Sequence, residues 1–215
     1  MGVWVIGASA RRAMVRRDVV VMACLMIVFS GAVMLSGRTG ADPLDPPGRD
    51  EVAPRLPVIV PTASNWQPKF PVPYDQSRHE VTEADITAER EMCQWYNPQY
   101  AAIRLQIERF NDSLIRANGD YGASGVQEKA DAVTANIDQS LEFLTPRVQA
   151  LTRRQDHADD IYFPLYQGES FYRLWEQMSN VGAGIHGRQP TWFVGPSFQR
   201  MMRFGSRIGR SHVCD

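Results

Sequence analysis

Local motifs for metal binding and nucleophilic catalysis are absent from this sequence. No H-x-x-x-H, H-E-x-x-H or D-x-D-x-D-G spacing occurs, so neither a zinc site nor a calcium loop is indicated. One compact group of metal-capable side chains has none of these spacings and is typical of a solvated helix end: Asp156, His157, Asp159 and Asp160. We therefore predict no metal ion and no cofactor.

The serine motif of hydrolases is missing as well. Ser124 lies in GASG, which is not a G-x-S-x-G elbow, and its position before a helical stripe favours a helix cap. No C-x-x-C pair occurs, which argues against an active redox site. We expect a protein that is not an enzyme. A catalytic site assembled from distant residues stays open, because such sites are defined by geometry.

Charge is missing from residues 19–35, an apolar run that follows four arginines and precedes Arg38. This bias predicts that the N-terminus stays on the cytoplasmic side of a membrane. As a helix the run is roughly 26 Å long, a little short of a bilayer core of about 30 Å and long for a signal-peptide core. Residues 1–41 are interpreted either as a signal peptide cleaved after Ala41 or as a single membrane anchor. Both alternatives place the rest of the chain outside the cytoplasm.

Cysteine is scarce, with three in 215 residues, and Cys24 lies within the apolar run. Outside the cytoplasm the other two, Cys93 and Cys214, are expected to form a disulfide, because nothing there keeps thiols reduced. Two free thiols are the alternative. A bond between them closes a loop that contains almost the whole folded part. The entropy that it removes from the unfolded chain corresponds to about 4 to 5 kcal/mol of free energy.

Proline is concentrated in one stretch, since nine of the 14 prolines lie in residues 42–80. Such density favours extended backbone without regular hydrogen bonds, so this stretch is interpreted as an extended linker. Within it, residues 56–60 and 66–74 are apolar enough to lie along the domain surface. Recognition by a proline-binding partner is the alternative. Residues 81–215 are long enough for one hydrophobic core and are predicted to form a single helical domain.

Apolar residues in this domain repeat at helical spacing, and no alternating stretch of comparable length competes. Thr82 with Asp85 predicts a capping box, and Ser124 with Gln127 predicts another. Further helix starts are predicted at Pro98, Pro146, Ser170 and Pro196. Two buried stripes are predicted: Ile103, Ile107, Phe110 and Leu114, then Val126, Ala130, Val133, Ile137, Leu141 and Leu144. The predicted fold class is all-α, a small irregular helical bundle closed by one disulfide after an N-terminal export or anchor helix.

Positive charge is unevenly spread, and only two of the basic residues are lysines. From Asp42 onward there are 18 basic and 23 acidic residues, whereas residues 187–215 alone have a net charge of +4. Four arginines share one face of the predicted last helix: Arg200, Arg203, Arg207 and Arg210. We expect this face to meet water or the acidic body of the domain. A membrane surface of anionic lipid or a partner protein is the alternative, and nucleic acid is not expected because the exported part is net acidic.

Aromatic residues gather in residues 162–175, with a further pair at residues 192–193. Most of these rings are expected in the core of a small helical domain. Six of them are also candidates for a groove that binds a sugar, lipid or aryl ligand: Tyr162, Phe163, Tyr166, Phe171, Trp175 and Trp192.

Several short sequence segments occur in a fixed order along the chain. They are FPVP at residues 70–73 before the first cysteine, IERFN at 107–111, YQGE at 166–169 and a closing cysteine, with Phe171, Trp175 and Met178 after the third segment. In this order the chain resembles a family of small secreted actinobacterial helical proteins, one of which is associated with siderophore export. The resemblance covers roughly residues 70–214 and implies a disulfide-cinched helical fold more than any function.

The leading hypothesis is a non-enzymatic exported protein of the cell envelope. It would act as an accessory or interaction subunit of a membrane transport or secretion system, with a membrane or envelope protein as its partner. It would be secreted, or anchored to the plasma membrane by its N-terminal helix with the C-terminal domain outside. The alternative is a binding module for a lipid, glycan or siderophore through an aromatic groove.

Overall fold

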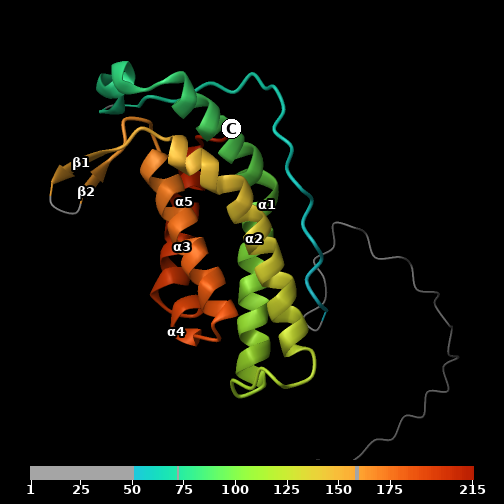
Figure 1. Ribbon diagram of the computed structural model, residues 1–215. Coiled ribbons are helices and arrows are strands. Elements are labelled where there is room, and N and C mark those ends of the chain that lie inside the picture. The colour runs from blue at the N-terminus through green and yellow to red at the C-terminus, as the bar shows by residue number, and fades with distance from the viewer. Residues whose placement is uncertain (1–50, 72, 158–159) are drawn as a thin grey trace, which may run out of the picture. The chain divides into compact units, whose positions relative to one another are not determined.

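The computed structural model describes residues 51–71, 73–157 and 160–215, all within one compact unit. Its elements are the 3₁₀ helix η1 (Tyr74–Glu80), α1 (Glu83–Arg116), α2 (Val126–Ala150), β1 (Arg154–His157), β2 (Asp160–Tyr162), α3 (Gly168–His186), α4 (Pro190–Phe193) and α5 (Pro196–Ser211) (Figure 1). α2 packs against both α1 and α3, and α3 also packs against α5. Within the described ranges no helix is both long and apolar enough to cross a bilayer. The predicted export segment, residues 1–41, lies outside the described residues.

The first long helix, α1, begins at the predicted capping box. Thr82 Oγ1 accepts a hydrogen bond from the Asp85 amide at 3.2 Å, and Asp85 Oδ2 accepts one from the Thr82 amide at 2.8 Å. This reciprocal pair is the capping box. After the last helical residue, Arg116, the chain turns through Asn118 and Gly119, whose φ angles are 51° and 81°. Positive φ at these two positions stops the helix.

Two predicted helix breaks are wrong, because Pro98 lies inside α1 and Pro146 lies inside α2. Proline removes one backbone donor and costs about 3 kcal/mol in a helix interior, so packing on neighbouring elements has to outweigh that cost. Beside the first proline, the Tyr96 hydroxyl donates to a backbone carbonyl of α5 at 2.8 Å. Beside the second, Trp175 Nε1 donates to Thr145 Oγ1 at 3.0 Å. Tertiary contacts of this kind keep both helices continuous.

Two predicted serine caps are also wrong. Ser124 lies one residue too early, because Gly125 is the residue before α2 and has a φ of 77°. Ser170 lies inside α3. The residue before this helix is Gln167, whose φ is 66°. Neither N-cap residue makes a side-chain hydrogen bond to its helix. In both helices the N-cap residue instead has a left-handed backbone conformation, and the helix begins directly after it. Pro196 opens α5 as predicted.

The fold is mostly helical, but the all-α prediction misses a two-stranded sheet. β1 and β2 form an antiparallel hairpin (Figure 1). In its register Arg154 lies opposite Tyr162. The strands have four and three residues. Strands this short cannot show a convincing alternation of apolar and polar residues, so periodicity gave no signal for them.

The two predicted stripes form the core between the long helices. All members of the α1 stripe are 4% exposed or less, and Leu141 is the one partly exposed member of the α2 stripe. The shorter helices contribute a second group of buried side chains: Phe171, Leu174, Met178, Phe198, Met201 and Ile208. Hydrophobic periodicity therefore located the core correctly.

A disulfide joins Cys93 and Cys214, in agreement with the predicted pair, with the sulfur atoms 2.06 Å apart. The bond ties the first third of α1 to the tail after α5, and Figure 1 shows the C-terminus beside α1. A second contact reaches the same tail, because Trp66 Nε1 donates to the Val213 carbonyl at 2.7 Å.

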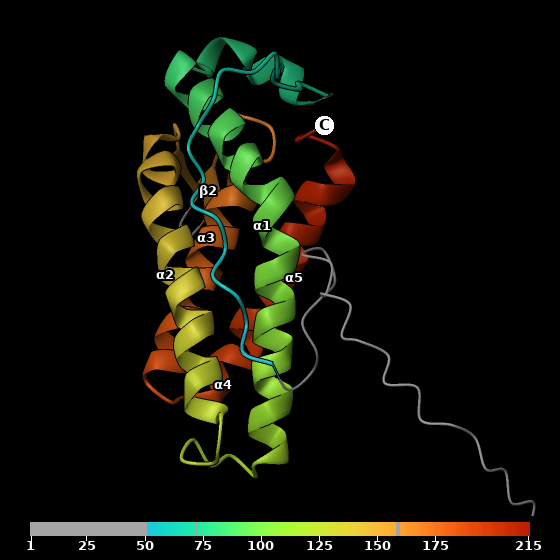
Figure 2. The same cartoon turned by 90° about the vertical axis from the view of Figure 1, so that its right-hand side faces the viewer.

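Residues 51–71, which we call the strap, come from the stretch interpreted above as a linker, and they run along α1 and α2 (Figure 2). Buried amide side chains bind the backbone of the strap. Asn136 donates to the Pro54 carbonyl at 2.9 Å and accepts from the Leu56 amide at 3.0 Å. Gln106 donates to the same Pro54 carbonyl at 3.3 Å. Polar groups of the two helices thus replace the backbone pairing that an extended chain lacks.

The side chains of the strap divide into two sets. Leu56 and Ile59, three residues apart, pack against the core, whereas Val58 and Val60 are 71% and 74% exposed. A spacing of three fits the turn of a polyproline II helix, as the proline content of this stretch favours.

Candidate functional site

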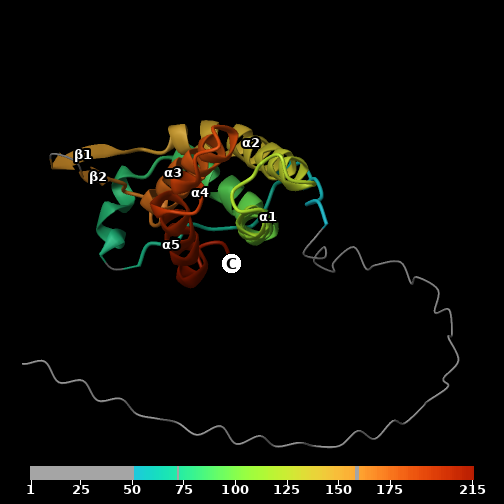
Figure 3. The same ribbon diagram turned by 90° about the horizontal axis from the view of Figure 1, so that it is seen from below.

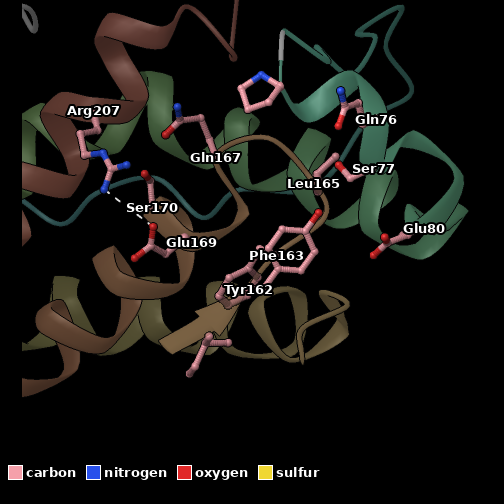
Figure 4. A pocket seen from close by; sticks show the side chains of 12 residues that line it. Gln76, Ser77, Glu80, Tyr162, Phe163, Leu165, Gln167, Glu169, Ser170 and Arg207 are labelled. Carbon is pink, nitrogen blue, oxygen red and sulfur yellow. Dashed lines mark ion pairs between the residues drawn. The ribbon is translucent and has the colours of Figure 1, made fainter. Parts of the chain in front are cut away.

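A cavity of about 580 Å³ lies between η1, β2, the loop after β2 and the first turn of α3, with Arg207 of α5 at its edge (Figure 4). Figure 3 shows η1 and the hairpin on the same side of the helices. The volume falls within the range of roughly 300 to 1,000 Å³ that is usual for small-molecule sites. The lining residues are Pro73, Gln76, Ser77, Glu80, Ile161, Tyr162, Phe163, Leu165, Gln167, Glu169, Ser170 and Arg207.

Local contacts bring the walls of the cavity together. Ser77 Oγ donates to the Pro164 carbonyl at 2.7 Å, which fastens η1 to the loop after β2. Phe163 packs closely on the start of α3, because a Cβ atom added at Gly168 would lie 3.2 Å from the Phe163 Cβ atom. Gln167 has a positive φ, which is uncommon for a residue other than glycine. Strained backbone of this kind occurs often at binding sites.

The amide oxygen of Gln167 is buried and has no hydrogen-bond partner within the described part of the chain. A buried acceptor left without a donor costs about 1 to 3 kcal/mol. The hydroxyl of Ser170, a residue only 1% exposed, lines the same cavity one helical turn away. A ligand that donates a hydrogen bond to Gln167 would remove the cost of the unpaired oxygen.

The charged side chains at the cavity are arranged as pairs. Arg154 forms an ion pair with Glu80, and its guanidinium lies 5.3 Å from the centre of the Tyr162 ring. Arg207 lies 3.8 Å from Glu169 (dashed line in Figure 4). Each lining carboxylate therefore has an arginine beside it, and neither sign of charge is left uncompensated.

The structure separates the six predicted aromatic residues. Tyr162 and Phe163 line the cavity, while Phe171 is 1% exposed and packs edge-on against Tyr96 at 6.4 Å. Tyr166 and Trp175 are half-buried and pack against the core. Trp192, on α4, is 43% exposed and does not line this cavity. Only the first two of the six thus belong to a common site.

The four predicted arginines of α5 are also separated. Arg200, Arg203 and Arg210 are exposed, and within the described residues they have no ion pair or ring contact. Arg207 is half-buried and reaches the cavity. The opposite side of α5 enters the core through Phe198, Met201 and Ile208.

The remaining lining residues were missed by the sequence analysis. Gln76 and Glu80 come from η1, which no pattern predicted, and they meet the hairpin only in the folded chain. Gln167, Glu169 and Ser170 lie at the start of α3, where the serine was interpreted as a cap. No local pattern marks these residues as a site, because they come from separate segments that meet only in the folded chain.

The described residues also bear on metal binding. Among them, no three His, Cys, Asp or Glu side chains are grouped so that they could hold a metal ion. Asp159, a member of the acidic group noted in the sequence, lies outside the described residues.

Comparison with known proteins adds no relative. No family model matches the chain, and neither a curated protein nor a solved structure matches it. The resemblance to secreted actinobacterial helical proteins therefore stays a hypothesis. The structure defines a class: a mostly helical protein whose first long helix is disulfide-bonded to its C-terminal tail, with a cavity of mixed aromatic and polar lining.

Proposed function

We propose that the protein is a non-enzymatic binding module of the cell envelope that holds a small ligand in the cavity between η1, β2 and α3. One observation carries the proposal: Tyr162 and Phe163 from the predicted aromatic set and Arg207 from the predicted basic set line one cavity of about 580 Å³. Ligand sites commonly combine aromatic walls with a few placed polar groups, and this lining has both. Export by residues 1–41 would place the cavity outside the cytoplasm.

The cavity proposal predicts a bound molecule and a variant that loses it. Native mass spectrometry of the chain recovered from its own cells is expected to show one retained small molecule. Tyr162→Ala removes an aromatic wall and is expected to weaken retention about tenfold or more, since a large ring supplies much of the contact area. Trp192→Ala is the matched control. It also removes a large aromatic ring, but Trp192 lies on α4 and does not line the cavity.

The comparison of these two variants decides the proposal. Circular dichroism melting of each variant checks that the fold survives. No retained molecule, together with no thermal shift when candidate ligands are added, would contradict ligand binding. Equal loss in both variants would show that the molecule sits elsewhere.

A second candidate function is the accessory or interaction subunit of a membrane transport or secretion system. The observation in its favour is the exposed and unpaired set Arg200, Arg203 and Arg210 on α5. A surface of one charge sign attracts a partner of the opposite sign and speeds its association. An acidic face on an envelope protein would therefore complement this surface.

The interaction hypothesis is tested by charge reversal and crosslinking on intact cells. Changing Arg200, Arg203 and Arg210 together to glutamate is expected to reduce co-purification of a membrane protein about tenfold. The control reverses Arg55, Arg104 and Arg116, which are exposed on the strap and α1 and change the net charge equally. The same loss in both triple variants would mean that total charge, and not the α5 surface, governs association.

A further inference from the structure

The geometry points to a neutral, hydroxyl-rich ligand, such as the sugar unit of a glycan, in the cavity between η1, β2 and α3. This inference rests on the proposed binding function and narrows its ligand from a small molecule of any kind to one chemical class. It depends on three properties of the lining: compensated charge, a mixture of hydrogen-bond donors and acceptors, and aromatic walls.

The charges at the cavity disfavour an ionic ligand. Arg207 already lies beside Glu169, and Glu80 already pairs with Arg154. A phosphate or carboxylate bound at Arg207 would lie close to the Glu169 carboxylate, and like charges in one site repel each other. A cationic ligand would meet Arg207 in the same way. A ligand without formal charge leaves both existing pairs intact.

The uncharged polar groups favour hydroxyls. Gln76, Gln167 and Ser170 line the cavity, and their amide and hydroxyl groups can both donate and accept hydrogen bonds. A sugar hydroxyl has the same double capacity. The buried oxygen of Gln167 lacks a donor within the described chain, and a hydroxyl proton would satisfy it once the amide turns toward the cavity that this residue lines. Figure 4 shows Gln167 on the same side of the cavity as Ser170 and Arg207.

The apolar part of the lining fits one face of a sugar ring and argues against an acyl chain. Tyr162 supplies a half-buried aromatic ring, with Ile161 beside it. Phe163 and Leu165, which are 4% and 1% exposed, back this wall from the core. The C–H face of a pyranose can pack on such rings while its hydroxyls point to the polar side. A hydrocarbon chain would cover the amides and hydroxyls without giving them partners, and burying unpaired polar groups is unfavourable.

Ligand-observed NMR on the full chain tests the ligand class. The neutral probes are maltotriose, cellotriose and diacetylchitobiose, and the charged or lipidic probes are glucose 6-phosphate, a hexuronate and laurate. We expect saturation transfer to at least one neutral probe and none to the other three. Gln167→Leu removes the unpaired acceptor and is expected to weaken binding of that probe about tenfold.

Gln177→Leu is the matched control for this substitution. Gln177 lies in α3, which begins directly after Gln167. Its buried amide oxygen also has no partner among the described residues, but it does not line the cavity. It should leave the affinity unchanged. Binding of glucose 6-phosphate, the hexuronate or laurate without binding of any neutral probe would overturn the ligand class and leave the binding function standing.

Two other outcomes also contradict the inference. If Gln167→Leu leaves sugar binding unchanged, the sugar binds at a place other than this cavity. No binding by any probe, combined with no retained molecule in native mass spectrometry, would overturn the inference and the proposed function together.

Discussion

Replacing Cys93 and Cys214 together by alanine is expected to lower the free energy of unfolding by about 4 to 5 kcal/mol. The two residues are 121 positions apart in sequence. A bond across so long a loop restricts the unfolded chain strongly, and the restriction grows with the logarithm of the loop length. Since net stabilities of domains are about 5 to 15 kcal/mol, the expected loss is a large part of the total.

Guanidinium denaturation of three samples measures this loss: the oxidised chain, the reduced chain and the double alanine variant. The reduced chain and the variant should unfold at the same, lower denaturant concentration. Reductant should have no effect on the variant, which serves as the control for unspecific effects of the reagent. Identical midpoints for the oxidised and reduced chains would contradict a stabilising bond.

The disulfide also lies where three segments meet. α1 contributes Cys93, the C-terminal tail contributes Cys214, and the strap reaches the tail through Trp66, which donates to the Val213 carbonyl. Asn97 of α1 adds a hydrogen bond to the Cys214 carbonyl at 3.1 Å. Loss of the covalent bond should therefore increase amide exchange in the tail and in the strap around Trp66 before it does so in the buried parts of α2 and α3.

The features of the fold that could be predicted from the sequence are those that depend on residues close together in the chain. The capping box of Thr82 and Asp85 and the stripe from Ile103 to Leu114 depend on residues within a few turns of each other, and both predictions are confirmed. Pro98 and Pro146 were predicted wrongly because the local cost of proline is outweighed by contacts with distant elements. Helix propensity is a weak prior when tertiary packing opposes it.

The path of the strap could be predicted only in part. Residues 56–60 and 66–74 were expected along the domain surface, and Leu56, Ile59, Trp66 and Phe70 do pack there, but the helices that they follow were not predicted. Asn136 is fully buried and binds the backbone of residues about 80 positions earlier. An asparagine within a helical stripe does not reveal whether it faces water or the backbone of another segment. Because Asn136 and Gln106 recognise main-chain groups, the side chains of the strap give no pattern that would disclose the pairing.

The lining of the cavity could also be predicted only in part from the sequence. Aromatic density identified Tyr162 and Phe163, but the other lining residues come from η1, α3 and α5 and converge only after folding. The sequence could say that this region was unusual in composition. It could not say which of its rings serve the core, as Phe171 does, and which reach a cavity.

Stability is expected to fall as pH rises above about 4.5, the ordinary pKa of a glutamate, because of Glu89 on α1. This side chain is fully buried, and neither of its carboxyl oxygens has a hydrogen-bond partner among the described residues. Burial, and secondarily the charge of Asp85, raises the pKa of Glu89 well above 4.5. Asp85 itself is bound by four donors, the amides and hydroxyls of Thr82 and Thr152.

The sign follows from proton binding. Between the two pKa values the folded chain keeps the Glu89 proton, while the unfolded chain has lost it. The folded state then binds more protons, so raising the pH favours unfolding. One such group contributes a slope of up to about 1.4 kcal/mol per pH unit. The contribution is absent below the unfolded pKa and stops growing once the pH passes the folded pKa.

Glu89→Gln keeps the shape of the side chain and removes its ionisation, so it isolates this contribution. Urea denaturation across acidic to mildly alkaline pH should give similar stabilities for both proteins at low pH and a growing advantage for the variant as pH rises. Glu83→Gln, exposed in the first turn of the same helix, is the control and should not produce that divergence. A difference between wild type and Glu89→Gln that stays constant with pH would mean that the buried carboxyl has a donor after all, such as a water molecule held inside the helical core.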